Sequence, residues 1–193
     1  MAALTRPAVL ARAAGLLVLG ALLLAILGRG LRAPFGGGVL GFIHMIDLVF
    51  HEAGHVIFGV FGRFLAVLGG SLNQVLIPAV CTGYFLRQAQ HAAAAVTLFW
   101  TGESVVDVAI YVADGRDTKL PLLADGLTHD WNWILSALSL RDQAEPIGRV
   151  VFLAGVFVML AALVLLALDL RRAASTRAPE GVLSSSASDR KIP

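Results

Sequence analysis

Residues 51–55 read His-Glu-Ala-Gly-His, an H-E-x-x-H sequence within an otherwise apolar stretch. On a helix, residues four apart project from one face, about 40° from each other, so both imidazoles can reach one metal ion. His51 and His55 are therefore candidate Zn²⁺ ligands. Glu52 is placed to take a proton from a zinc-bound water. Ionisable groups are costly in an apolar segment and usually mark a site, so the context favours chemistry over a chance match.

The composition is that of a membrane protein. Hydrophobic residues make up 58% of the 193 residues and charged residues 15%, and the mean hydropathy is +0.80. A soluble domain is about 45–50% apolar and about 25% charged. The net charge of +2 comes from scattered basic residues, so we expect no nucleic-acid partner. The single cysteine, Cys81, excludes an intrachain disulfide and a multi-cysteine zinc site.

Five apolar runs are long enough to cross a bilayer, which takes roughly 20 residues each. They cover residues 8–27, 39–61, 64–85, 91–113 and 147–168, with approximate ends. We therefore predict an all-α, polytopic transmembrane helix bundle that forms one domain over residues 1–170. A polar tail, residues 171–193, has too little apolar surface to pack and is predicted to be disordered.

Two features qualify this pattern of spans. Gly69, Gly70 and Pro78 predict an interrupted third span, which is tolerated where protein or a watery cavity receives the freed backbone groups. Between the fourth and fifth spans, apolar residues at helical spacing in residues 131–138 predict a short helix at the membrane interface.

Two polar stripes run along the second and fourth spans. His44, Asp47, His51 and His55 share one face of the second span, and Glu103, Asp107, Tyr111 and Asp114 share one face of the fourth. Carboxylates in an apolar span need a partner, so we expect the stripes to face each other.

The stripes also suggest roles. Asp47 is one turn before His51 and can accept the second N–H of its imidazole. His44 can equally well satisfy a neighbouring helix. Glu103 and Asp107 can supply a ligand, hold a ligating histidine or anchor structure, and the last two roles are favoured.

A catalytic zinc usually takes three protein ligands and leaves a fourth position for water. His129, in the connection after the fourth span, is the first choice for the third ligand. Asp130 or Asp125 comes next, then Glu103 or Asp107. Asp130 also suits capping of the short helix.

The motif in a span, residues 70–73 in the following span and a later Asp/His-bearing segment resemble site-2-protease-like membrane zinc metallopeptidases. More closely, residues 61–65, 111–114 and 129–131 resemble a group of small bacterial integral-membrane proteins regarded as zinc metallopeptidases. The resemblance covers residues 43–138 and implies zinc binding in a bacterial inner membrane. The chain lacks the Asn-Pro-Asp-Gly segment that supplies an aspartate ligand in site-2 proteases, so zinc binding is better supported than proteolysis.

We therefore expect a zinc metallohydrolase, a peptidase acting in the membrane or at its interface on a membrane protein or peptide. Glu52 is the expected general base, and Asn73 is a candidate substrate or oxyanion contact, with helix–helix hydrogen bonding as its alternative. The alternative function is a non-proteolytic metal-binding subunit, as an assembly scaffold or a proton or metal path. The sequence leaves the orientation in the membrane open. Basic residues near both ends of the chain favour a cytoplasmic location for each end, whereas five full crossings put the two ends on opposite sides.

Overall fold

A computed structural model describes residues 6–32, 37–121 and 128–175. Over these residues the chain is helical and contains no strand, which confirms the predicted all-α class. The elements are α1 (Arg6–Arg29), α2 (Gly38–Phe58), η1 (Gly59–Phe61), α3 (Arg63–Arg87), α4 (His91–Asp114), α5 (Asp130–Ala137), η2 (Arg141–Gln143) and α6 (Ala144–Ser175). Five of these helices are long and apolar enough to span a membrane, and they match the five predicted runs. The protein is a multi-pass membrane protein. The tail beyond residue 175 lies outside the described residues.

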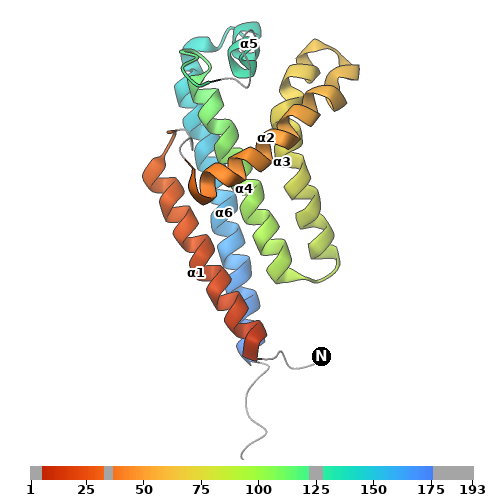
Figure 1. The fold of residues 1–193 in the computed structure, drawn as a ribbon, viewed down its shortest axis with the longest axis vertical. Coiled ribbons are helices and arrows are strands. Elements are labelled where there is room, and N and C mark those ends of the chain that lie inside the picture. Colours follow the sequence, from red (N-terminus) through yellow and green to blue (C-terminus); the bar gives the residue numbers. More distant parts are fainter. Residues whose placement is uncertain (1–5, 33–36, 122–127, 176–193) are drawn as a thin grey trace, which may run out of the picture.

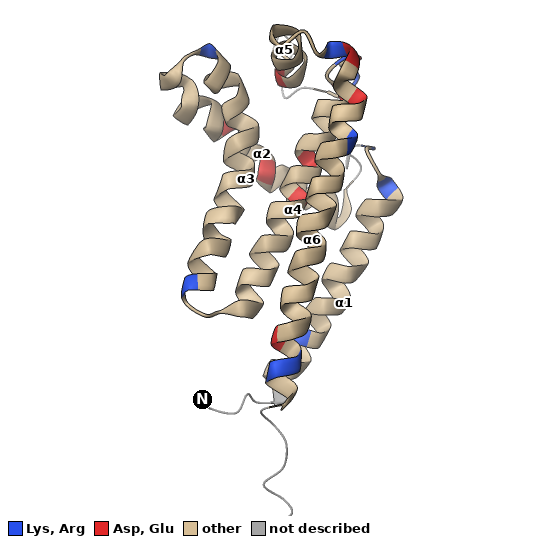
Figure 2. Cartoon of the chain, turned by 180° about the vertical axis from the view of Figure 1, so that it is seen from behind, with Lys and Arg blue, Asp and Glu red and all other residues tan. Residues whose placement is uncertain are grey.

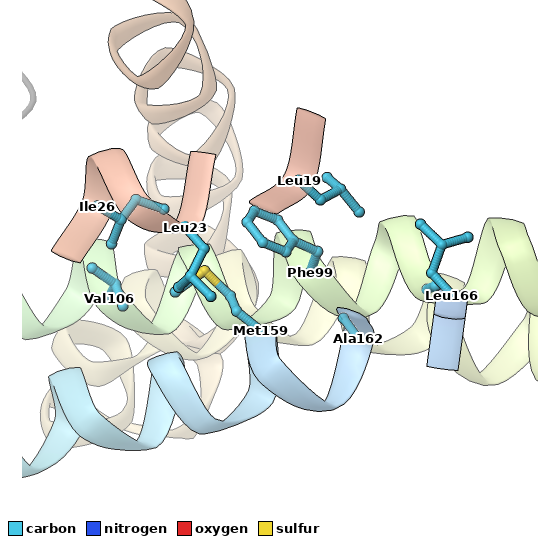
Figure 3. Packing of buried hydrophobic residues seen from close by; sticks show 9 residues of the cluster. Leu19, Leu23, Ile26, Phe99, Val106, Met159, Ala162 and Leu166 are labelled. Atoms are coloured by element: carbon cyan, nitrogen blue, oxygen red, sulfur yellow. The ribbon is translucent and has the colours of Figure 1, made fainter. Parts of the chain in front are cut away.

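The centre of the bundle is the α4–α6 pair, with α1 packed beside it (Figure 1). Glycines let α4 and α6 approach closely, because a Cβ built on Gly102 would lie 2.7 Å from the carbonyl oxygen of Gly155. Apolar side chains from the three helices fill the space beside this contact (Figure 3). They are Leu19, Leu23, Ile26, Ala95, Phe99, Val106, Met159, Ala162 and Leu166.

Both ends of the described helical chain lie at the same end of the bundle (Figure 1). The Arg12 guanidinium pairs with Asp169 near the end of α6 at 2.6 Å, and His91 at the start of α4 lies 3.8 Å from the same carboxylate. The start of α1, the start of α4 and the end of α6 therefore lie close together. The helix α2 starts beside the middle of α4 and rises obliquely to the opposite end of the bundle (Figure 1).

The predicted interruption of the third span is wrong. The helix α3 runs without a break from Arg63 to Arg87, with Pro78 inside it. Proline lacks the backbone N–H that a helix uses, so the loss is one hydrogen bond rather than the end of the helix. Nearby, the Thr82 hydroxyl donates to the carbonyl of Pro78 at 2.9 Å.

Candidate metal centre

His51 and His55 both direct Nε2 at one point, while the Nδ1 of each ring contacts an acceptor of its own. The Nδ1 of His51 lies 2.7 Å from the side-chain oxygen of Gln74, and the Nδ1 of His55 lies 2.8 Å from the carbonyl oxygen of Ala66. Both partners are acceptors, so each Nδ1 carries the hydrogen and donates it. The two Nε2 atoms are thereby left to face a shared partner, where each can carry a second proton and donate it, or can bind a metal ion instead.

The shared partner is the carboxylate of Asp130. Its Oδ2 lies 2.9 Å from Nε2 of His51 and 3.2 Å from Nε2 of His55. Burial raises the pKa of Asp130, but hydrogen bonds from the two histidines outweigh burial and hold its pKa below the usual range. Asp130 is therefore an anion near neutral pH, and the two nitrogens and the oxygen converge as a donor set for a cation.

The short helix α5 is the element that brings Asp130 to the histidines. The indole of Trp131 donates to the Ser71 hydroxyl at 3.0 Å, and the Asn132 amide donates to the Gly115 carbonyl at 2.8 Å. The Arg63 guanidinium lies 4.9 Å from the ring centre of Trp133. These contacts tie α5 to both α3 and α4, so Asp130 is held in place by two helices.

Glycines bring α2 and α3 together at the same level. A Cβ on Gly54 would lie 2.2 Å from the carbonyl oxygen of Gly69, so no larger residue fits between the two backbones. A Cβ on Gly70 would lie 2.5 Å from Nε2 of His51 and 2.7 Å from Nε2 of His55. Because Gly70 has no side chain, the space over α3 stays open for the two rings and for a bound ion.

A cavity of about 520 Å³ opens beside this cluster and includes Glu52 in its wall. His51, Glu52 and His55 offer ligand atoms that all lie within 4.8 Å of one another. The cavity is lined by His44, Met45, Leu48, His51, Glu52, His55, Gln74, Asp107, Tyr111, Pro121, Thr128, His129, Asp130 and Trp131. This volume lies within the range of roughly 300–1,000 Å³ that small-molecule pockets have.

His129 does not join the histidine pair. Its Nδ1 accepts the backbone N–H of Asn132 at 3.2 Å, which makes His129 the N-cap of α5, and its Nε2 lies 3.2 Å from Asp114. His129 and Asp130 therefore exchange their expected positions. His129 caps α5, and Asp130 contacts the two motif histidines. The expectation that His129 lies beside the two motif histidines is therefore wrong, and Asp130 is the residue that contacts both of them. Asp125 lies outside the described residues.

The residue that orients His51 is Gln74 and not Asp47. Asp47 Oδ1 accepts from the Trp100 indole at 2.7 Å and from the Ser104 hydroxyl at 3.1 Å, so the expected support of His51 by Asp47 is wrong. Gln74 was missed by the sequence reasoning. The sequence feature that marks Gln74 is its polar amide in an apolar span, one turn after Gly70 and on the same helix face.

Asn73 does not reach the cavity. Its side-chain nitrogen donates to the Phe50 carbonyl at 2.7 Å, and the residue is buried. The helix–helix alternative is therefore the one that fits Asn73, and the substrate or oxyanion role is not supported.

The two polar stripes face each other as predicted. His44 Nδ1 lies 2.9 Å from Asp107 Oδ1, and the rings of His44 and Tyr111 are stacked with centroids 6.2 Å apart. Gln74 donates to Asp107 Oδ2 at 3.4 Å, so Asp107 supports the amide that supports His51. Asp107 therefore supports His51 indirectly, through Gln74. Glu103 is not among the residues that line the cavity. Figure 2 shows acidic segments on α2 and on α4 near the middle of the bundle.

The donor set fits Zn²⁺ in type and spacing. Zinc binds imidazole nitrogen and carboxylate oxygen at about 2.0–2.2 Å, which puts neighbouring tetrahedral ligand atoms roughly 3.3 Å apart. The observed separations of 2.9 and 3.2 Å between Asp130 and the histidines need to widen by only a few tenths of an ångström. Three protein ligands would leave a fourth zinc position for water, and Glu52 lies within 4.8 Å of the histidine ligand atoms.

No protein-family model, curated protein or solved structure matches the chain. The conclusions about this site therefore rest on its geometry.

Proposed function

We propose that this protein is an integral-membrane zinc metallohydrolase, a peptidase that acts at the membrane interface. The observation that supports the proposal best is the convergence of His51 Nε2, His55 Nε2 and Asp130 Oδ2 while both Nδ1 atoms donate elsewhere. Each Nε2 that faces the Asp130 carboxylate either carries a proton or binds a metal cation, and a set of two imidazoles and one carboxylate suits zinc.

Glu52 supplies the acid–base chemistry in this proposal. Its carboxylate borders the cavity within 4.8 Å of the histidine ligand atoms, so it can take a proton from an attacking water and return it to the leaving amine. When bound, Zn²⁺ supplies Lewis acidity that makes water acidic and polarises the scissile carbonyl. Gln74 and the Ala66 carbonyl hold the two imidazoles so that both Nε2 atoms stay directed at the same point.

The substrate class follows from the walls of the cavity. Met45 and Leu48 on α2 and Trp131 on α5 give it apolar sides, and Met45 is 57% exposed. We infer that an apolar peptide segment from the bilayer or its interface is the substrate. We propose a bacterial inner membrane as its location, as the resemblance noted above implies.

The alternative is a non-proteolytic metal-binding subunit, for which the bundle acts as a scaffold or a proton or metal path. The observation that favours it is the presence of Glu103 and Asp107 deep in the bundle, where they are 1% and 3% exposed. A scaffold or path does not need a general base at position 52.

Replacing Glu52 with glutamine separates the two functions. Glu52→Gln keeps the shape of the side chain and all three proposed ligands, but removes the proton acceptor. Hydrolysis should fall by roughly 10²–10⁴-fold while bound zinc stays at the wild-type level. The assay compares membrane-protein cleavage products in cells expressing either form, beside zinc analysis of the purified proteins.

Glu145→Gln is the matched control, because Glu145 is an exposed glutamate outside the cavity wall that pairs with Arg149. It should leave both cleavage and zinc content unchanged. Equal cleavage by wild type and Glu52→Gln with zinc intact would favour the metal-binding subunit.

A further inference from the structure

Tyr111 is a polar residue of the cavity wall that the proposed zinc chemistry does not use. It lies on α4, one turn after Asp107, and it lines the same cavity as the H-E-x-x-H motif. Its ring packs against two imidazoles. The rings of Tyr111 and His44 are nearly parallel with centroids 6.2 Å apart, and the centroids of Tyr111 and His129 are 6.1 Å apart. These contacts hold the phenol ring in place, one from α2 and one from the N-cap of α5.

The hydroxyl of Tyr111 makes no hydrogen bond within the part of the chain that the structure describes, and its oxygen is not among the buried atoms that lack a partner. The oxygen is therefore accessible, and the open space beside this residue is the cavity that it lines. A tyrosine hydroxyl usually finds a partner when its ring is packed inside a protein. The O–H of Tyr111 is thus a donor that a molecule bound in the cavity can use.

Most other hydrogen-bond donors of the cavity wall are already engaged within the protein. The amide of Gln74 and the indole of Trp131 donate to neighbouring side chains. The His129 ring contacts a partner at each of its two nitrogens. The other hydroxyl of the wall belongs to Thr128, which is exposed. Tyr111 therefore combines an available donor with a ring that packing holds in place.

Peptide hydrolysis makes use of such a donor. When water attacks the carbonyl carbon of a peptide bond, the carbonyl oxygen becomes negative until the C–N bond breaks, and donors aimed at that oxygen lower the barrier. The side chains around the motif do not supply one, because Glu52 and Asp130 are acids and the Nε2 atoms of His51 and His55 are the proposed ligands. A phenol O–H in the wall of the same cavity is a group of the required type.

We propose that Tyr111 is a further catalytic residue, which donates a hydrogen bond from its hydroxyl to the carbonyl oxygen of the scissile peptide bond. This inference rests on the proposed peptidase function, and it makes α4 the third helix, beside α2 and α5, that contributes a group to the reaction. The tyrosine keeps its proton throughout. The proton of the attacking water goes to Glu52 and then to the leaving amine, so Tyr111 stabilises negative charge and transfers no atom.

Tyr111→Phe removes the hydroxyl and keeps the ring that packs against the two imidazoles. With an internally quenched apolar peptide in detergent micelles, kcat should fall by roughly 10²–10³-fold, the usual cost of one such donor, while KM stays within about threefold of the wild-type value. Bound zinc should stay at the wild-type level. Tyr84→Phe is the matched control, because Tyr84 is the other tyrosine of the chain, 58% exposed on α3 and outside the cavity wall. An unchanged kcat in Tyr111→Phe would overturn the proposal.

Binding of a peptide phosphinate tests the same contact without turnover. A phosphinate places a charged oxygen where the attacked carbonyl oxygen would lie. Zinc-loaded Tyr111→Phe should bind it roughly 10–150-fold less tightly than the wild type, the range for a hydrogen bond to a charged group, while Tyr84→Phe binds it normally. Equal affinity of the three proteins, or no binding by any of them, would overturn the proposal whether or not peptides are cleaved. A wild type that binds the phosphinate through Tyr111 but cleaves no peptide would refute the peptidase function and retain the contact.

Nuclear magnetic resonance of the wild type tests the contact without altering Tyr111. With tyrosine labelled by ¹³C at Cζ, the two tyrosines of the chain give two signals, and Tyr84→Phe assigns them. Addition of the phosphinate should shift the Tyr111 signal and leave the Tyr84 signal in place. A Tyr111 signal that does not move at saturating phosphinate would contradict the proposal even if Tyr111→Phe fails to fold.

Discussion

Adding a single methyl group at Gly70 should weaken metal binding without replacing any proposed ligand. A Cβ at this position would lie 2.5 Å from Nε2 of His51 and 2.7 Å from Nε2 of His55. Non-bonded carbon and nitrogen atoms keep roughly 3.5 Å between them, so the rings would have to move by about 1 Å. Zinc sites tolerate deviations of only about 0.2 Å in their ligand distances, so we expect Gly70→Ala to weaken zinc affinity by at least tenfold.

The control for this variant is Gly83→Ala. Gly83 lies on the same helix, and a Cβ there meets nothing within 4 Å. Both substitutions raise helix propensity by about 0.5–1 kcal/mol, so the change in backbone entropy is matched.

The assay is competition for zinc against a chelator of known affinity, with thermal unfolding as a check on the fold. Gly83→Ala should bind zinc as the wild type does. If Gly70→Ala also bound zinc with unchanged affinity, the two Nε2 atoms would not be the ligands and the assignment of the site would be refuted.

Three further predictions concern the groups around the ion. Asp130→Ala should lower zinc retention strongly, whereas His129→Ala should cost about 1 kcal/mol through loss of the helix cap and leave zinc largely bound; zinc analysis and thermal unfolding of both variants check this. Gln74→Leu should weaken zinc affinity by about 10–100-fold, measured by chelator competition, because the His51 imidazole loses the acceptor that fixes its tautomer. On acidification, zinc should be released, because protons compete with the metal for the ligand nitrogens and the carboxylate oxygen. A zinc-binding titration against pH checks this, and an affinity that does not change with pH would contradict it.

The helices of this protein were predictable because hydropathy and length alone mark an apolar helix. The five predicted runs match five helices to within a few residues over most of their ends. The meeting of the two stripes followed from the cost of carboxyl groups in an apolar environment, and the contact of His44 with Asp107 confirms it. Both inferences use properties that are local to one helix.

The oblique path of α2 was not predictable in the same way. Hydropathy shows that a helix is long enough to cross, but packing against its neighbours sets its tilt. The close contact of Gly54 with Gly69 and the contacts of Asp47 with Trp100 and Ser104 fix α2 between α3 and α4. None of these pairs is marked as a pair by the sequence.

The exchange of roles between His129 and Asp130 has a similar cause. The direction of each side chain at the start of a helix depends on the residue at which the first turn begins. A sequence pattern locates that residue only to within one or two positions. The docking of Trp131 on Ser71 and of Asn132 on Gly115 decides it. These are contacts between distant parts of the chain, so they became visible only in the structure.

X-ray absorption at the zinc edge tests the central claim most directly. Purified protein loaded with zinc should hold about one ion per chain, with two imidazole nitrogens and oxygen donors at about 2.0–2.2 Å. Zinc should be lost from the His51→Ala/His55→Ala double variant. A spectrum without imidazole ligands, or full zinc occupancy in the double variant, would contradict the assignment of the metal centre.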